Sequence, residues 1–292
     1  MLSIFKKPIV AIVILAIIIG VAVWFFINKK TPEPVPIKTE EPKTLGVKVE
    51  SIGVSVQGRK IESYTYGNGP KKLVFVGGIH GGYEWNSVLL AYQFIDYLDK
   101  NLSTVPTNLT ITVIPSANPD GVYKVVGKEG RFSVADVSKD PVLLASARFN
   151  ANEVDLNRNF DCDWKPEAVW RSKKVSAGTE PFSEPESKVL QQFFLKNKPD
   201  GVVFWHSQAG AVYAGDCKGI FLPKTLEIMD VYAKASGYDA KKTFDSYAIN
   251  GASDGWLSSI GIPVVSVELK THETVEWEQN LAGIKALLEY YK

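Results

Sequence analysis

The apolar positions follow two different patterns along the chain. From Pro8 to Ile27 no residue is charged, and isoleucine, valine, leucine and alanine dominate. About 20 such residues are enough for a helix to cross the hydrocarbon core of a membrane. After Leu45, short apolar runs alternate with stretches of helical apolar spacing, which is typical of a folded domain. The pattern therefore predicts an N-terminal membrane segment followed by a globular part.

The segment 1–30 is predicted to be a transmembrane anchor. Lysines flank both ends of the apolar run, and Trp24–Phe26 falls where an interfacial aromatic belt lies. A soluble core helix is disfavoured because it rarely stays apolar on every face. A cleaved signal peptide is the rival interpretation, although the run is long for one and no small-x-small cleavage site follows it. The flanking charges nearly tie, so they do not fix the orientation.

Residues 31–44 read TPEPVPIKTEEPKT, rich in proline and charge. This composition predicts a stiff, extended linker without a core. The folded domain is therefore expected to span residues 45–292.

Strands and helices alternate within that part, which predicts an α/β fold. We expect a three-layer α/β/α sandwich around a mixed, mostly parallel sheet. The helix after Ser183 shows a capping-box pattern with Glu186. The expected elements are a hairpin over Val54–Tyr66 around Gln57-Gly58, strands at Leu73–Val76, Leu109–Ile114, Val202–Trp205 and Val264–Val267, and helices at Trp85–Leu98, Glu184–Leu195, Leu222–Ala235 and Trp277–Tyr291.

Composition narrows the possible functions. The net charge is +1, from 33 basic and 32 acidic residues among 292, which gives no support for nucleic-acid binding. The only two cysteines, Cys162 and Cys217, are either buried free thiols or one disulfide. A disulfide requires an oxidising compartment. Together with the membrane segment, a disulfide favours a single-pass membrane protein whose folded domain is extracytoplasmic.

Polar residues with metal-binding chemistry follow the apolar strands. His80 and Glu84 come after the first strand, and His206 ends another. In layered α/β sheets, ligand sites form beyond the strand ends. Catalytic zinc takes three protein ligands, commonly histidine and carboxylate. His80, Glu84 and His206 are thus candidate ligands, whereas His272 lies in a polar run and is expected to be uninvolved.

Three further clusters carry potential chemistry. Glu268 closes a buried strand, where an unpaired glutamate is unusual. Asn118-Pro119-Asp120-Gly121 follows another strand and has the composition of a plain turn. Asp155–Phe160 reads DLNRNF with Arg148 just upstream; an arginine fork binds a carboxylate through two parallel hydrogen bonds, although a surface ion pair is the simpler interpretation.

In this order, the clusters resemble the zinc carboxypeptidase family of the carboxypeptidase A and B type. The matching features are the GGIH…E loop, NPDG, DLNRNF, the strand-borne HS and the late glutamate before leucine, over about Lys60 to Leu269. The PFSEPES stretch at Pro181–Ser187 is similar to bacterial members that trim peptides, including cell-wall peptides. The resemblance implies one Zn²⁺ per chain.

It also implies roles for single residues. His80, Glu84 and His206 match the zinc ligands, Glu268 matches the general base that activates zinc-bound water, and Arg148 resembles the arginine that polarises the scissile carbonyl. Zinc and Arg148 would share the developing oxyanion charge.

The substrate-binding residues are implied in the same way. Asn157 and Arg158 match the pair that grips the substrate's terminal carboxylate, and Tyr247 is similar in placement to a mobile tyrosine that closes over the substrate, with a one-residue ambiguity against Trp256. Arg148 lies closer to DLNRNF than the comparable arginine of the digestive enzymes.

The spacing of the first two ligands also departs from the family. Three residues, Gly81–Tyr83, separate His80 from Glu84 instead of two, and a glycine bulge is expected to bring the carboxylate to the metal.

The leading hypothesis is therefore a zinc metallocarboxypeptidase that hydrolyses a C-terminal peptide bond of a peptide or cell-wall peptide. The alternatives are a zinc amidase or endopeptidase of cell-wall peptides, and a catalytically dead peptide-binding domain. Cys162 and Cys217 each follow a predicted site segment. If those segments converge on one metal, their continuations lie close together, so a disulfide between the two cysteines is expected.

Overall fold

The computed structural model describes residue 24 and residues 46–292. Leu45–Lys292 forms one compact unit. The predicted anchor at 1–30 and linker at 31–44 lie outside the described residues, Trp24 apart. Within the described part of the chain, no helix is both long and apolar enough to span a bilayer.

An eight-stranded sheet forms the centre, in the order β1-β2-β4-β3-β7-β12-β8-β11. Four neighbouring pairs are parallel and three are antiparallel, so the sheet is mixed and mostly parallel, as predicted. The strands are β1 (Lys48–Val54), β2 (Lys60–Gly67), β3 (Lys71–Val76), β4 (Leu109–Ile114), β7 (Gly201–Ser207), β8 (Ala211–Ala214), β11 (Asp239–Lys241) and β12 (Val264–Leu269).

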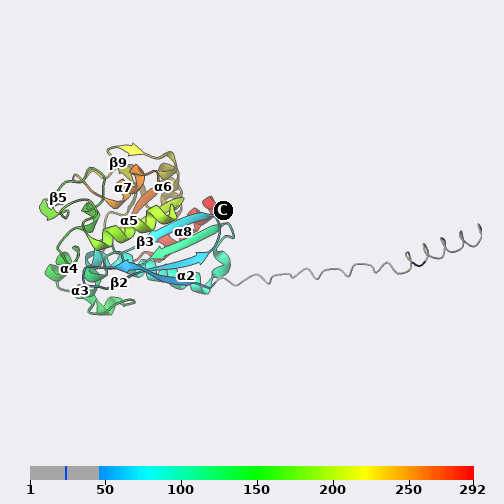
Figure 1. Cartoon of the computed structure of the whole chain (residues 1–292), viewed down its shortest axis with the longest axis horizontal. Helices are drawn as coiled ribbons and strands as arrows, with labels where there is room; N and C mark the ends of the chain where they lie inside the picture. The colour runs from blue at the N-terminus through cyan, green and yellow to red at the C-terminus, as the bar shows by residue number, and fades with distance from the viewer. Residues whose placement is uncertain (1–23, 25–45) are drawn as a thin grey trace, which may run out of the picture. The chain divides into compact units, whose positions relative to one another are not determined.

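Helices cover both faces of this sheet. Because side chains alternate along a strand, Leu73 and Phe75 of β3 enter one hydrophobic cluster, and Val74 and Val76 enter another. The first cluster is shared with α2 (Trp85–Lys100), α6 (Pro223–Ser236) and α8 (Trp277–Tyr291), and the second with α5 (Pro185–Asn197) and α7 (Ser253–Ser259). Figure 1 shows α5 crossing one face of the sheet, with α2 and α8 on the other. The predicted α/β layering is therefore present.

Figure 1 shows α3, α4 and β5 together at one end of the sheet. The smaller elements of the domain are the helices α3 (Pro119–Val126) and α4 (Pro141–Ser146), the 3₁₀ turns η1 (Gly81–Glu84), η2 (Leu102–Thr104), η3 (Val134–Asp136) and η4 (Leu156–Arg158), and the hairpins β5–β6 (Glu167–Trp170, Lys173–Ser176) and β9–β10 (Asp216–Cys217, Ile220–Phe221).

Two local predictions are wrong. Asn118 begins α3 instead of a plain turn: its side chain accepts a hydrogen bond from the Gly121 amide, and Pro119 occupies the first helical turn. The expected capping box is absent, since α5 begins after Glu184 without a side-chain cap. The Glu186 carboxylate instead accepts a hydrogen bond from the Val56 amide at 3.1 Å, far away in sequence.

Candidate active site

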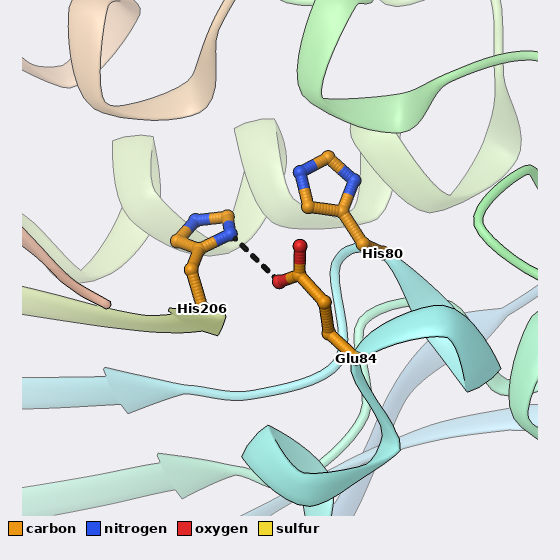
Figure 2. Close-up of side chains that lie close together, drawn as sticks. All are labelled: His80, Glu84 and His206. Atoms are coloured by element: carbon orange, nitrogen blue, oxygen red, sulfur yellow. Dashed lines mark hydrogen bonds and ion pairs between the residues drawn. The ribbon is translucent and has the colours of Figure 1, made fainter. Parts of the chain in front are cut away.

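The strand ends bring the three candidate ligands together. His206 is the penultimate residue of β7, and His80 lies four residues beyond the end of the neighbouring parallel strand β3. Parallel strands end at the same edge of a sheet, so both imidazoles lie at the carboxyl edge. Glu84 enters from η1, and Figure 2 shows its carboxylate between the two rings.

A 3₁₀ turn, not the expected bulge, carries Glu84 to this position. Gly81 has φ +49°, and a Cβ there would lie 2.6 Å from the Ala147 carbonyl oxygen, so only glycine fits. The inserted stretch includes Tyr83, whose ring centroid lies 5.0 Å from that of Trp170 and 4.6 Å from that of His272. The longer spacing therefore leaves Glu84 beside both histidines.

The cluster has the composition of a zinc site. One donor atom from each of His80, Glu84 and His206 lies within 4.8 Å of the others, and all three residues are buried. The Glu84 Oε2 lies 3.2 Å from the His206 Nδ1 and accepts a hydrogen bond from the Ser207 amide at 3.2 Å. The buried Nδ1 of His80 has no hydrogen-bond partner among the described residues. An unsatisfied buried nitrogen next to a second imidazole and a carboxylate is consistent with a metal ion at this point.

Burial and nearby charge shape the protonation of the cluster. Burial, reinforced by the charge of Arg148, lowers the pKa of His80 well below its usual value. Burial also lowers the pKa of His206, but the hydrogen bond and charge of Glu84 outweigh it and raise that pKa. A neutral His80 keeps a lone pair available for a cation.

Glu268 lies next to the cluster because of strand register. In the parallel pair β7–β12, Glu268 is the partner of His206, so both side chains point to the same face of the sheet. The carboxylate faces the cleft and is only partly exposed, and burial raises its pKa, although His206 acts in the opposite direction. A carboxylate with a raised pKa beside a metal site has the properties of a proton acceptor.

Asp155 links Arg148 to the cluster. Its fully buried carboxylate accepts a hydrogen bond from the Arg148 Nε at 2.9 Å and lies 3.4 Å from the His80 Nδ1. Arg148 also approaches Glu84 at 3.6 Å and stacks over Trp170 at 4.7 Å. The sequence predicts no role for Asp155, and its position in DLNRNF, close to Arg148 and Arg158, is the only signal that indicates one.

Arg158 lies in the same cleft with its side chain buried. Its Nε and Nη2 donate to the Val169 carbonyl at 3.2 and 3.1 Å, and its Nη1 donates to the Asn157 carbonyl at 2.6 Å. Burial lowers its pKa, whereas the charge of Asp155 acts in the opposite direction. Within residues 46–292 no carboxylate forms an ion pair with Arg158.

Ser253 orients the side chain of Asn157. Its Oδ1 accepts hydrogen bonds from the Ser253 amide and hydroxyl, each at 2.9 Å, so its two N–H donors remain for the cleft. Tyr247 lines the cleft and packs 4.9 Å from Phe244. Trp256 belongs to the hydrophobic core, which places Tyr247, rather than Trp256, at the cleft.

One cavity of about 600 Å³, a size that suits a small ligand or a peptide end, is lined by the three candidate ligands and by Arg148, Asn157, Arg158, Tyr247 and Glu268. Asp254 also lines it, with its two oxygens accepting hydrogen bonds from the Gly255 amide at 2.8 Å and the Ser266 hydroxyl at 2.9 Å. Within the described ranges no basic residue pairs with Asp254.

The comparisons with known proteins agree with this geometry. The family model described as zinc carboxypeptidase matches residues 37–276. The chain belongs to the zinc carboxypeptidase family. Its His-Glu-His cluster fits the zinc after which the family is described.

Relatives in this family include a γ-D-glutamyl-L-diamino acid endopeptidase of Lysinibacillus sphaericus, 24% identical over 75% of this chain and 59% of the relative. Human carboxypeptidase O is 27% identical over 66% of this chain and 56% of the relative. The chain thus spans less than two thirds of the length of these curated relatives.

Solved zinc carboxypeptidase structures share the fold. Murein-tripeptide amidase MpaA from Escherichia coli O157 is 22% identical, with a TM-score of 0.56 over 82% of this chain and 91% of the amidase. Thrombin-activatable fibrinolysis inhibitor is 19% identical, with a TM-score of 0.66 over 84% of this chain and 69% of that protein.

A disulfide lies close to the Arg158 segment in the sequence of this zinc carboxypeptidase domain. Cys162 and Cys217 are bonded, with their Cα atoms 5.9 Å apart, as the sequence predicts. The Cys162 carbonyl accepts a hydrogen bond from the Gly251 amide at 2.8 Å, and the Gly251 carbonyl accepts one from Phe160 at 2.9 Å. The bridge therefore stabilises the segment that follows Arg158.

His272 lies near the cluster without belonging to it. Its Nδ1 is 2.7 Å from the Ser207 hydroxyl, which donates to the Asn86 Oδ1 at 3.0 Å. A hydroxyl has one proton to donate, so the His272 Nδ1 is the donor in its bond with Ser207. His272 thereby positions Ser207, the residue next to His206, and is not itself one of the three candidate ligands.

Proposed function

We propose that this domain is a zinc-dependent carboxypeptidase that hydrolyses the C-terminal peptide bond of its substrate, with zinc bound by His80, Glu84 and His206. The observation that carries the proposal is Arg158, a buried cation without an ion pair among residues 46–292, in the same cleft as the metal cluster. A buried charge normally has a partner. The carboxylate of a peptide C-terminus supplies one.

The hydrogen bonds of Arg158 leave suitable donors for that carboxylate. An arginine has five N–H groups, and the Val169 and Asn157 carbonyls occupy three of them. One N–H remains on each terminal nitrogen, which is the arrangement of a bidentate fork. Asn157 adds its amide donors, and Tyr247 closes over the bound end.

The reacting end of the cleft carries the groups for hydrolysis. When bound, zinc lowers the pKa of a coordinated water and polarises a carbonyl oxygen. Arg148, held at its Nε by Asp155, keeps its terminal nitrogens for the carbonyl oxygen as negative charge develops. The Glu268 carboxylate accepts the proton of the attacking water and delivers it to the leaving amine.

Asp254 favours a cationic side chain on the residue that is released. Its carboxylate lines the cleft, and its two neutral hydrogen-bond donors, from Gly255 and Ser266, leave its charge unbalanced. An ammonium group of a lysine or diamino acid would balance that charge.

Cell-wall peptides are a second candidate substrate. The names of the relatives include an endopeptidase acting at a γ-D-glutamyl-L-diamino acid bond and a murein-tripeptide amidase. A diamino acid carries both an α-carboxylate for Arg158 and an amine for Asp254, so the same cleft accommodates both substrate classes.

We further propose that the domain works outside the cytoplasm, attached to the membrane through residues 1–30. The support is the Cys162–Cys217 disulfide, since cytosolic thiols stay reduced, together with the apolar run at Pro8–Ile27.

The test is hydrolysis by the purified, zinc-loaded protein of matched peptides that end in a free carboxylate or an amide. We expect release of a single C-terminal residue from the free acid, with lysine preferred to leucine. Equal cleavage of free and amidated peptides, or cleavage only at internal bonds, would contradict the carboxypeptidase assignment.

A further inference from the structure

A third arginine lines the cleft and has no role in the proposed hydrolysis. Arg171 sits in the tight turn of the β5–β6 hairpin, and its guanidinium borders the same cavity as the metal cluster. Its Nη2 donates to the Tyr83 hydroxyl at 3.2 Å. Tyr83 is itself packed against Trp170 and His272. Arg171 is therefore anchored on a defined wall of the cleft.

Arg158 and Arg171 contact the same hairpin at different points. Arg158 donates to the Val169 carbonyl of β5, whereas Arg171 lies in the turn and is bonded to Tyr83. If the substrate's terminal carboxylate binds at Arg158 and its scissile carbonyl lies at Arg148, the preceding residue extends onto the wall of Tyr83, Trp170 and Arg171. That residue supplies the acyl group of the bond that breaks.

The charge of Arg171 is not balanced within the described protein. The Arg148 guanidinium pairs with Asp155. In the same hairpin as Arg171, Lys174 pairs with Glu167 at 2.7 Å. Arg171, by contrast, forms no ion pair with any carboxylate of residues 46–292, and only one of its five N–H donors has a protein acceptor there. The free donors of Arg171 border the cleft.

The backbone also holds Arg171 in an uncommon conformation. Its φ is +57°, in the left-handed region that favours glycine or asparagine. A non-glycine residue kept in such a conformation is frequent at ligand clamps. The residue in this left-handed conformation, Arg171, has a long cationic side chain and lines the cleft.

We propose that Arg171 is a specificity residue that binds a carboxylate on the acyl-side residue of the substrate. This inference rests on the proposed function, because it takes its direction along the cleft from Arg158. The carboxylate belongs either to an ordinary α-linked aspartate or glutamate, or to a glutamate joined through its γ-carboxyl group, whose α-carboxylate stays free. Both present the same anion to the arginine fork.

The experiment compares substrate pairs that differ only in this charge. One pair has α-linked glutamate or glutamine before a C-terminal lysine, and the other has γ-linked D-glutamate or its α-carboxamide. We expect zinc-loaded wild type to prefer the carboxylate of at least one pair by about two- to fivefold in kcat/KM, as suits an exposed ion pair. The pair with the larger preference identifies the source of the carboxylate.

Variants show whether Arg171 causes that preference. Arg171→Gln is expected to reduce the ratio to about one, and Arg171→Lys to retain part of it. Lys173→Gln is the matched control, because Lys173 is an exposed neighbour with the same charge that does not line the cleft; it should behave as wild type. No preference in wild type for either pair, or a preference that survives Arg171→Gln, overturns the proposal.

Binding measurements separate this proposal from the proposed function. Calorimetry with the zinc-loaded Glu268→Gln variant measures affinity for the same peptides without turnover. A carboxylate preference in binding that Arg171→Gln removes supports the role of Arg171 even if wild type hydrolyses none of the peptides. Hydrolysis of all four peptides at equal rates overturns the role of Arg171 and leaves the carboxypeptidase function standing.

Discussion

Replacing Arg158 with glutamine changes how the cleft holds the end of a peptide. The substitution removes the charge and the two free donors of the fork. It also leaves the Val169 and Asn157 carbonyls without their donors. Each unpaired buried group costs about 1–3 kcal/mol of stability, so activity alone would mix folding with recognition.

A ratio of two substrates removes that ambiguity. Loss of stability lowers kcat/KM equally for a peptide with a free C-terminal carboxylate and for its amide. Loss of recognition affects the free acid. Hydrogen bonds to a charged group contribute about 1.5–3 kcal/mol, so the free-acid to amide ratio should fall about 10- to 150-fold. Arg158→Lys keeps the charge without the fork and should give an intermediate ratio.

The control is Arg131→Gln, since Arg131 pairs with Asp96 at 2.8 Å and does not line the cleft. Its free-acid to amide ratio should equal that of wild type. An equal fall for both substrates in Arg158→Gln would mean that Arg158 is a structural residue and that another group binds the carboxylate.

Three further predictions follow from the geometry. Replacing Cys162 and Cys217 with serine should lower the free energy of unfolding by about 4 kcal/mol in urea titrations, because the bond joins residues 55 apart; a loss under about 1 kcal/mol would refute this. His206→Ala should lose stoichiometric zinc in metal analysis while His272→Ala retains it, and zinc at full stoichiometry in His206→Ala would remove it from the ligand set. Asp254→Asn should reduce the preference for C-terminal lysine over leucine about tenfold, and an unchanged ratio would place the selecting group elsewhere.

Long apolar patterns predicted the main elements well. The strand Leu109–Ile114 and the helix Trp277–Tyr291 have the predicted bounds, because their burial depends on a periodicity that the sequence displays. The capping box at Ser183 failed because Glu186 bonds to the Val56 amide, a contact made only by the folded chain. Short strands such as β8 and β11 were missed, since three or four residues carry too little periodicity.

In the candidate site too, contacts that form only in the folded chain could not be predicted from the sequence. The convergence of His80, Glu84 and His206 could be predicted because strand ends share one edge of a sheet. The importance of Asp155 and Arg171 could not be predicted, because it depends on contacts made across the fold. Asp155 contacts His80 and Arg148, and Arg171 contacts Tyr83. The predicted span at 1–30 stays a prediction.

The most direct test of the central claim is the Glu268→Gln variant, assayed together for zinc content and peptide hydrolysis. Glutamine is close in size to glutamate but cannot accept the proton. The variant should keep one zinc per chain and the fold of the wild type, while kcat falls about 10²- to 10⁴-fold. A fall of less than tenfold with zinc retained would contradict the role of Glu268 as general base at this metal site.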